Sequence, residues 1–340
     1  MLRKLLRTAL AAFATQAQAQ TPTPIYGQEL EGFTYPYPLH HYVFQSQGVD
    51  LQMAYMDVAP TGPAAAQANG SVALLLHGKN FCGATWEASI KALSAAGYRV
   101  IVPDQVGFCA STKPARYQYS FQQLATNTAA LLESLGVHHA VVVGHSTGGM
   151  LAVRYALMSP AAVDKLVLVN PIGLEDWKAL GVPGRTVDQW YARELKLSAE
   201  SVRSYERATY YVGHWKPEFE RWVDMLAGLN AGPGHVLVAW NSALIYDMIF
   251  TQPVVYELGK LKPPTVLMIG DADTTAIGSD IAPPEVKARV GHYAELGKAA
   301  AAAIPRARLI EFHGYGHAPQ IEDPGYFNEV LVQALGDAMP

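Results

Sequence analysis

The chain has 340 residues, of which 50% are hydrophobic and 16% are charged. That apolar share is enough for a large packed core, which excludes disordered, collagen-like and coiled-coil proteins. The 25 basic and 29 acidic residues give a net charge of −4. No basic run is interleaved with aromatic residues, so nucleic acid is not expected as a partner. With two cysteines, Cys82 and Cys109, the chain is neither a disulfide scaffold nor a CxxC-type zinc module.

The first nineteen residues have the three regions of a secretory signal peptide. Arg3, Lys4 and Arg7 form a positive start, a short apolar stretch follows, and Ala17–Ala19 (AQA) offers a cleavage site. We therefore expect cleavage after Ala19 and a secreted or periplasmic protein. No other stretch approaches the roughly 20 apolar residues that span a bilayer, so no membrane anchor is expected in the mature form.

The next segments indicate an arm followed by a hairpin. Residues 20–38 are rich in Pro, Thr, Gln and Tyr, which cannot sustain a helix or a central strand, so an extended N-terminal arm is expected. Between His40 and Ala59 two apolar stretches flank a Ser-Gln-Gly turn at 46–48. This pattern is typical of an antiparallel pair of strands.

From residue 72 onward, short continuous apolar runs alternate with helical segments. Continuous runs indicate strands buried on both faces, and parallel strands need helical crossovers. The predicted strands are 72–76, 99–103, 140–144, 165–170, 265–270 and 307–312, and the predicted helices lie near 84–96, 120–135, 148–159, 284–302 and 325–335. The order predicts an α/β fold, with a mostly parallel central sheet flanked by helices and built from residues 39–172 and 261–340.

This alternation stops in residues 173–260, whose pattern is helical. A helical block inserted at the carboxyl ends of parallel strands covers the site that such sheets build there, so a helical cap is expected. Five of the six tryptophans lie in it. We expect its aromatic residues to line an apolar substrate pocket with few charges. The candidate pocket residues are Phe81, His145, Trp177, Trp215 and Trp240.

The strongest chemical signal is the G-x-S-x-G motif at Gly144–Gly148. An apolar strand runs directly into the motif and a helix follows it. On such a sharp turn a serine hydroxyl is pushed out at the top of the sheet, so Ser146 is the predicted nucleophile. The backbone amide of Thr147, at the helix start, is one expected oxyanion donor. The second is the amide of Lys79 or Asn80 in the turn after strand 72–76, and the sequence leaves that choice open.

The serine needs a base, and the base needs a carboxylate. His317 follows the last strand on a glycine-flanked loop and is the predicted base, whereas His313, His77 and His145 are expected to pack or to bind backbone. In the loop after strand 265–270 Asp273 is the predicted acid. Asp271, the second choice, more plausibly caps the turn.

With these residues in place, the chain resembles α/β-hydrolase fold enzymes that carry a helical cap. The resemblance covers about residues 40–337 and rests on HG at 77–78, DQVGFCAS at 104–111, GHSTGG at 144–149, VLVNP at 167–171, GDAD at 270–273 and GYGH at 314–317. A serine nucleophile argues against epoxide hydrolase and haloalkane dehalogenase chemistry, for which the family uses aspartate. Cys109 stands where relatives usually have the second glycine of D-x-x-G-x-G-x-S.

The resemblance implies a serine hydrolase that cleaves a small, largely apolar carboxylic ester or lactone through an acyl-enzyme, without cofactor or metal. Its partner would be a small-molecule substrate, and the oligomeric state stays open. One alternative is carbon–carbon bond hydrolysis of a dienoate-type ketone, which related capped hydrolases perform with the same triad. Another is a binding protein that keeps the fold without catalysis, although a receptor needs no activated nucleophile.

The two cysteines lie in loops that follow the third and fourth strands, and both loops emerge at the edge that carries the nucleophile. Their tips can approach the ~4.4–6.8 Å Cα separation of a disulfide, which would persist after export. A Cys82–Cys109 disulfide is therefore expected, with two unpaired, buried thiols as the alternative.

Overall fold

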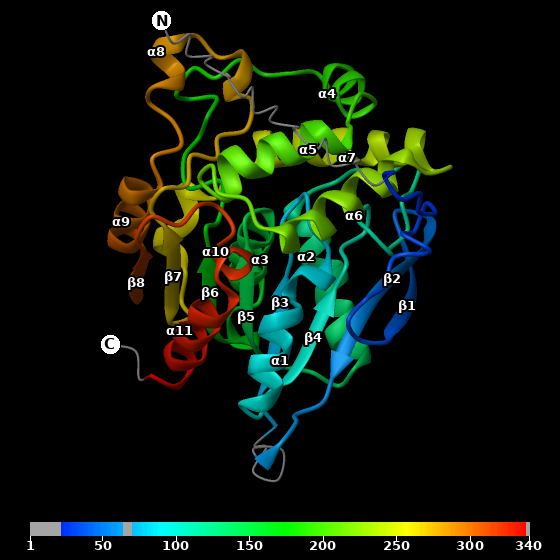
Figure 1. Cartoon of the computed structure of the whole chain (residues 1–340). Coiled ribbons are helices and arrows are strands. Elements are labelled where there is room, and N and C mark those ends of the chain that lie inside the picture. Colours follow the sequence, from blue (N-terminus) through cyan, green and yellow to red (C-terminus); the bar gives the residue numbers. More distant parts are fainter. Residues whose placement is uncertain (1–21, 64–69, 338–340) are drawn as a thin grey trace, which may run out of the picture.

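A computed structural model of the protein describes residues 22–63 and 70–337. Within these residues an eight-stranded sheet has the order β1-β2-β4-β3-β5-β6-β7-β8 (Figure 1). The strands β3 to β8 are parallel, whereas β2 pairs antiparallel with both β1 and β4. The α/β fold predicted from the alternating pattern is confirmed. The strands are β1 Leu39–Ser46, β2 Val49–Val58, β3 Val72–Leu76, β4 Arg99–Pro103, β5 Ala140–His145, β6 Val163–Val169, β7 Thr265–Gly270 and β8 Ala307–Phe312.

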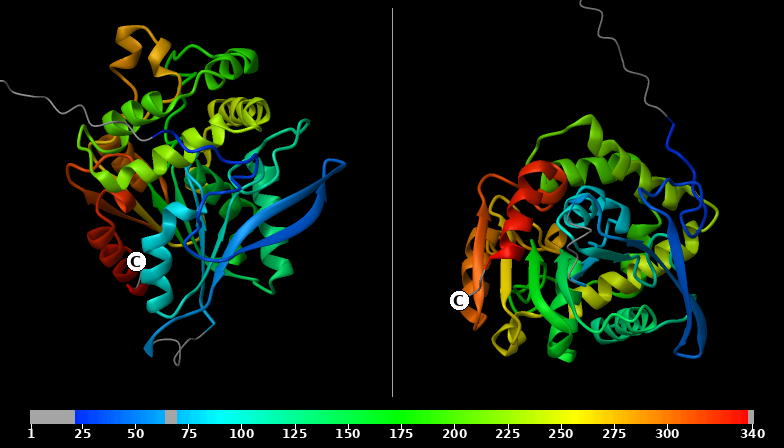
Figure 2. Two further views of the ribbon diagram at one scale, coloured as in Figure 1. Left: turned by 45° about the vertical axis from the view of Figure 1, so that its right-hand side comes forward. Right: turned by 90° about the horizontal axis from the view of Figure 1, so that it is seen from below.

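Helices lie on both sides of the sheet (Figure 2), and alternate residues of the parallel strands belong to two separate apolar clusters. Val143 and Val167 belong to the apolar cluster that includes residues of α1 and α11. Val142 and Leu168 belong to the cluster that includes residues of α2 and α3. Burial on both faces explains why these strands read as continuous apolar runs. The core helices are α1 Glu87–Ala95, α2 Phe121–Ser134, α3 Thr147–Met158, α8 Pro284–Lys287, α9 Tyr293–Ala303, α10 Pro319–Glu322 and α11 Pro324–Gly336.

The helix expected near 284–302 is interrupted between α8 and α9. Gly291 lies there with φ +77°, a left-handed conformation that favours glycine. Its amide donates to Glu175 Oε1 at 2.8 Å, so the break is held by a buried side chain from the start of the insertion. The alanine-rich composition of this segment favoured a continuous helix and gave no sign of that contact.

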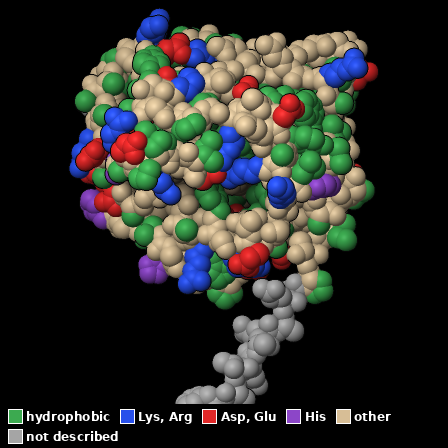
Figure 3. All heavy atoms as spheres, turned by 90° about the horizontal axis from the view of Figure 1, so that it is seen from above, with side chains coloured by type: hydrophobic (Ala, Val, Ile, Leu, Met, Phe, Trp, Pro, Cys, Tyr) green, Lys and Arg blue, Asp and Glu red, His purple; other side chains and the backbone are tan. Residues whose placement is uncertain are grey.

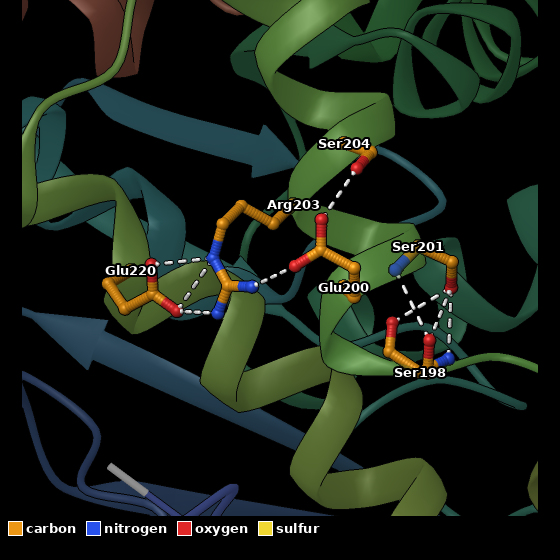
Figure 4. A network of polar contacts seen from close by, with 6 residues as sticks. All are labelled: Ser198, Glu200, Ser201, Arg203, Ser204 and Glu220. Carbon is orange, nitrogen blue, oxygen red and sulfur yellow. Dashed lines mark hydrogen bonds and ion pairs between the residues drawn. The ribbon is translucent and has the colours of Figure 1, made fainter. Parts of the chain in front are cut away.

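The insertion between β6 and β7 is a block of helices that lies over one end of the sheet (Figures 1 and 2). Arg203 of α5 binds Glu200 of its own helix and Glu220 of α6, and thereby joins the two helices (Figure 4). Ser198 and Ser201 form a capping box at the start of α5. The helices of the insertion are α4 Val187–Glu194, α5 Ala199–Tyr205, the π-helical turn η4 Glu206–Tyr210, α6 Glu220–Ala231 and α7 His235–Thr251, with short 3-10 turns at Pro217–Phe219 and Val255–Lys260.

The arm, described from residue 22 onward, has no regular structure before β1 and lies against α6. The amide of Tyr26 donates to Gly228 O at 3.1 Å. A Cβ at Gly228 would lie 2.6 Å from the Tyr26 ring, so this close approach requires glycine. The predicted signal peptide lies outside the described residues. Among the described helices none has the length and apolar character needed to cross a membrane.

Candidate active site

The turn between β5 and α3 carries Ser146 in a strained backbone conformation. Its φ of 55° and ψ of −119° lie outside the regions that non-glycine residues prefer. The motif glycines permit this turn. A Cβ at Gly144 would lie 2.2 Å from Gly148 O, and a Cβ at Gly148 would lie 2.2 Å from Leu76 O. Only residues without a Cβ fit these two positions, so strand and helix can meet closely enough to expose the serine hydroxyl.

The structure brings Ser146, His317 and Asp273 together from three separate strand ends. The Ser146 hydroxyl donates to His317 Nε2 at 2.8 Å, and His317 Nδ1 donates to Asp273 Oδ2 at 2.6 Å. His317 and Asp273 are each only 1% exposed. The contact fixes the imidazole tautomer that leaves Nε2 free to accept the serine proton. This is the geometry that activation of a serine nucleophile requires.

Asp273 is itself held by two further residues. Thr275 donates to Asp273 Oδ1 from its amide at 2.8 Å and from its hydroxyl at 2.7 Å. Asn170, at the end of β6, donates from Nδ2 to Asp273 Oδ2 at 2.9 Å. Asp271 instead binds His313 Nδ1 at 2.8 Å and the Gly314 amide at 2.7 Å, both on the loop after β8. The structure therefore distinguishes the two aspartates as the sequence analysis did.

Two further histidines support the site without being in position to act as its base. His145 Nε2 donates to the backbone oxygen of His317 at 2.8 Å, and its ring packs on Phe81 and His317. Burial and the neighbouring His317 lower the pKa of His145 well below its ordinary value, so this imidazole is neutral. His77 Nδ1 donates to Gly78 O at 2.8 Å, and its Nε2 accepts from the Gln105 amide at 3.1 Å.

The three predicted oxyanion residues border one small cavity together with the nucleophile. Thr147 is the first residue of α3, and Lys79 and Asn80 lie in a turn closed by the Phe81 amide donating to Gly78 O at 3.2 Å. Gly78 lets this turn approach, because a Cβ there would lie 2.9 Å from His145 Nδ1. The cavity has a volume of about 20 Å³. Its wall includes Ser146, His317 and all three candidate donors.

The rest of this inner cavity is aliphatic and tyrosine-rich. The Tyr210 hydroxyl accepts from Asn80 Nδ2 at 3.0 Å, and its ring lies 4.9 Å from that of His317. Sequence reasoning missed the tyrosines because helical periodicity alone does not show which cap residue faces the nucleophile. The remaining lining residues are Ile172, Tyr205, Tyr246, Ile249, Thr275 and Ile277.

The expectation that cap tryptophans line this pocket is wrong. Trp177 stacks on Phe250, and Trp215 packs edge-on against Tyr211. Trp240 donates from its indole nitrogen to Ala115 O at 3.2 Å. These indoles pack cap segments against one another and, through Trp240, against the core. Burial of their large apolar surfaces stabilises these contacts. Phe81 also lies outside the inner cavity wall, and its ring instead contacts the rings of His145 and Tyr210.

A larger cavity of about 550 Å³ shares Asn80, Tyr205 and Tyr246 with the inner one. It contains Arg185, Arg193, Glu194, Lys196 and Asp280, so the prediction of few charges is wrong for this part of the site. These residues come from α4, from the segments on either side of it and from the 3-10 turn Ser279–Ile281.

Comparison with known proteins shows which family this chain belongs to. The family model described as alpha/beta hydrolase fold matches residues 73–324. The chain belongs to the α/β-hydrolase family. A probable hydrolytic enzyme from Pseudomonas aeruginosa PAO1 shares 62% identity with this hydrolase at a TM-score of 0.91, over 93% of this chain and 100% of that one.

Two further proteins are similar to this chain at lower identity. An uncharacterized protein of Mycobacterium tuberculosis is 26% identical over 291 residues, which are 80% of this chain and 77% of the relative. An esterase from Exiguobacterium antarcticum matches at a TM-score of 0.68 with 18% identity, over 88% of this chain and 100% of that one, and at that identity shows the shared fold alone.

The expected disulfide is not formed in this α/β-hydrolase. Cys82 and Cys109 are both free and buried. Together with a carboxylate oxygen of Asp104, their sulfurs lie within 4.8 Å of one another, so the loops do meet as expected. Each thiol has another partner: Cys82 Sγ lies 3.0 Å from Met225 Sδ, and Cys109 donates to Phe81 O at 3.4 Å. Cys109 has φ +43°, which explains why glycine is usual at its position in the family.

Proposed function

We propose that the protein is an exported serine hydrolase that cleaves a small carboxylic ester or lactone through an acyl-enzyme. The observation that carries this proposal is the continuous hydrogen-bonded chain from Asp273 through His317 to Ser146, which ends at a cavity lined by candidate oxyanion donors. A carbonyl carbon placed at Ser146 Oγ would have its oxygen beside the Thr147 amide.

The proposed reaction proceeds in two halves. His317 takes the proton of Ser146 as Oγ attacks the carbonyl, and the Thr147 amide with that of Lys79 or Asn80 stabilises the oxyanion. His317 then protonates the leaving alkoxide, and the acyl group stays on Ser146. In the second half His317 removes a proton from water, which attacks the acyl carbon, and His317 then returns the proton to Ser146 Oγ as the bond from Oγ to the acyl carbon breaks and the acid is released. Asp273 stabilises the imidazolium in both halves.

The wall of the inner cavity supports an apolar group next to the scissile carbonyl. Ile172, Ile249 and Ile277 present aliphatic surface there. The apolar part of a substrate that contacts this wall would be bound through the burial of its apolar surface. Carbon–carbon bond hydrolysis would use the same three residues, and comparison of ester with dienoate-ketone turnover separates the two reactions.

The test combines active-site labelling with turnover. A fluorophosphonate probe should label the wild type and the control Ser204→Ala, a substitution on the cap surface, but not Ser146→Ala. Turnover of aryl and alkyl esters should fall by about 10⁴-fold or more in Ser146→Ala and His317→Ala, with no larger loss in the double variant because the residues act as a unit. Labelling without turnover of any ester or lactone would refute the reaction class, and absence of labelling would favour a binding protein.

A further inference from the structure

The two cavities of the site lie in series, and their sizes constrain how a substrate can bind. The inner cavity has a volume of about 20 Å³, which is only slightly more than the space that one water molecule needs. Asn80, Tyr205 and Tyr246 line both cavities, so the outer cavity of about 550 Å³ adjoins the inner one and has room for the rest of a substrate. The outer cavity then contacts the part of the substrate that lies away from the scissile carbonyl. This reasoning rests on the proposed hydrolysis at Ser146.

The two carboxylates of the outer cavity are each already bound by a cation. Asp280 accepts two hydrogen bonds from the Arg185 guanidinium, at 2.9 and 2.6 Å. Glu194, which is 3% exposed, accepts from Lys79 Nζ at 3.0 Å and from the Ser242 hydroxyl at 2.6 Å. Burial raises the pKa of Glu194, but Lys79 and Ser242 outweigh burial and lower it below its ordinary value. Glu194 is therefore ionised and neutralises Lys79.

Arg193 differs from these paired cations. In the described part of the chain no carboxylate lies within ion-pair distance of its guanidinium. Its Cζ lies 5.5 Å from the ring centre of Trp190 and 5.3 Å from that of Tyr246, so two aromatic faces hold the group in place. The side chain is exposed and lines the outer cavity. Seen from the cap side, basic side chains border a hollow (Figure 3).

The shared wall connects this cation to the catalytic residues. Tyr246, which supports the Arg193 guanidinium, also lines the inner cavity beside Ser146 and His317. Lys79 Nζ lies 3.7 Å from the centre of the same Tyr246 ring, but this ammonium already forms an ion pair with Glu194. Lys79 and Arg193 both contact Tyr246, and Glu194 forms its ion pair with Lys79. The charges of Glu194 and Asp280 act on Arg193 at longer range, but within the part of the chain that the structure describes Arg193 is the cation there without a direct ion-pair partner. A planar guanidinium held by rings is preorganised to bind a carboxylate through two parallel hydrogen bonds.

We propose that the substrate is an ester bearing a carboxylate at the end remote from the scissile carbonyl, and that Arg193 binds this carboxylate. The aliphatic inner wall contacts the segment next to the carbonyl, and the outer cavity contacts the charged end. The proposed substrate class consists of monoesters of aliphatic dicarboxylic acids and equivalent ω-carboxylate esters. Arg193 is a specificity-determining residue and takes no part in bond cleavage.

The experiment compares monoethyl with diethyl esters of dicarboxylic acids from succinate to suberate. Each pair has the same carbon chain and differs in whether its far end is an anion. The wild type should show a higher kcat/KM for the monoester at one or more chain lengths. Arg193→Gln should raise KM for that monoester by about 10- to 100-fold, the range of a charge-assisted hydrogen bond, and change the diester less than about twofold. Arg193→Lys should restore part of the loss.

Lys196→Gln is the matched control, because it removes another cation from the same cavity wall. It should affect the monoester much less than Arg193→Gln does, with thermal unfolding curves showing that both variants fold. Equal losses in the two variants would contradict specific binding at Arg193, because they would show that the carboxylate is attracted by the overall positive charge of the cavity. A wild type that prefers diesters at every length would overturn the carboxylate proposal while leaving ester hydrolysis intact. Failure to hydrolyse any diester or monoester would instead refute the proposed function.

Discussion

Asn170 shows how a single residue settles the choice between two nearby aspartates. Its side chain donates to Asp273 Oδ2 and to Gly270 O, and accepts from the Gly270 amide. It thereby fixes the strand end from which Asp273 reaches His317, with its own φ at 36°. A non-glycine residue in that conformation is strained, and its three contacts explain why the strain persists. Asn170 thus positions the acid, Asp273, rather than the nucleophile.

We expect Asp273→Asn to lower kcat by about 10⁴-fold, because an amide no longer accepts from His317 Nδ1 and favours the wrong tautomer. Asp271→Asn should change kcat less than about threefold, since the Asp271 carboxylate binds His313 and Gly314 in the loop after β8 and not His317. Steady-state kinetics on one aryl ester measures both variants. A larger loss in Asp271→Asn than in Asp273→Asn would show that the acid has been assigned to the wrong residue.

The residues that sequence reasoning found are those with a local signal. Ser146 stands in a strand–turn–helix motif, and His317 and Asp273 follow strands whose apolar runs are unmistakable. Asn170, Tyr210 and Arg193 carry no such signal, because their roles arise from contacts between segments far apart in the chain. Tyr210, for example, reaches Asn80 across 130 positions.

At the scale of elements, the same contrast separates the core from the cap. The strands predicted at 72–76, 99–103, 265–270 and 307–312 have the observed bounds. In the first three, burial leaves an apolar run that ends where the strand ends, whereas β8 is a half-buried strand at the edge of the sheet. Each of the cap helices carries at least one aromatic residue, such as Trp190 of α4, Tyr205 of α5, Trp222 of α6 and Tyr246 of α7. The packing of α4 to α7 on one another decides which of these aromatic residues points to the active site, and sequence periodicity does not show that packing.

The π-helical turn Glu206–Tyr210 joins α5 to the active-site tyrosine and contains a buried acid. Glu206 is 0% exposed, and neither carboxyl oxygen has a hydrogen-bond partner among the described residues. Burial, with a smaller contribution from Glu220, raises the pKa of Glu206 well above its ordinary value. The folded protein therefore holds this proton more tightly than the unfolded chain does. Its stabilising contribution is fully present below the unfolded pKa and is lost as the pH rises through the folded one.

Glu206→Gln should remove this pH dependence, because glutamine resembles the protonated acid at every pH. Above the ordinary glutamate pKa, the wild type should lose about 1.4 kcal/mol of stability relative to the variant for each pH unit, until the folded pKa is reached. At acid pH the two proteins should unfold at similar temperatures. Thermal unfolding between pH 4 and pH 9 measures the difference, and parallel curves across that range would contradict the assignment.

At the scale of the whole molecule, the proposed export makes a prediction about the mature chain. Expression of the full sequence in a Gram-negative host should give a periplasmic or secreted protein whose N-terminus is Gln20, one residue beyond Ala19. Arg3→Glu with Lys4→Glu should retain the precursor in the cytoplasm, because the positive start of the signal is lost. N-terminal sequencing of fractionated cells decides the point. An uncleaved protein in the cytoplasm of wild-type cells would refute export.

The small volume beside Ser146 has a consequence for which molecules can accept the acyl group. In the proposed acyl-enzyme, the small inner cavity beside Ser146 favours the smallest acceptor, which is water, over alcohols or amines of greater bulk. Hydrolysis should therefore dominate over transesterification even when alcohols are abundant. Enlarging the cavity at Tyr205 or Tyr246, both cap residues outside the triad, would be the direct route to turning this enzyme from a hydrolase into a transferase for synthesis.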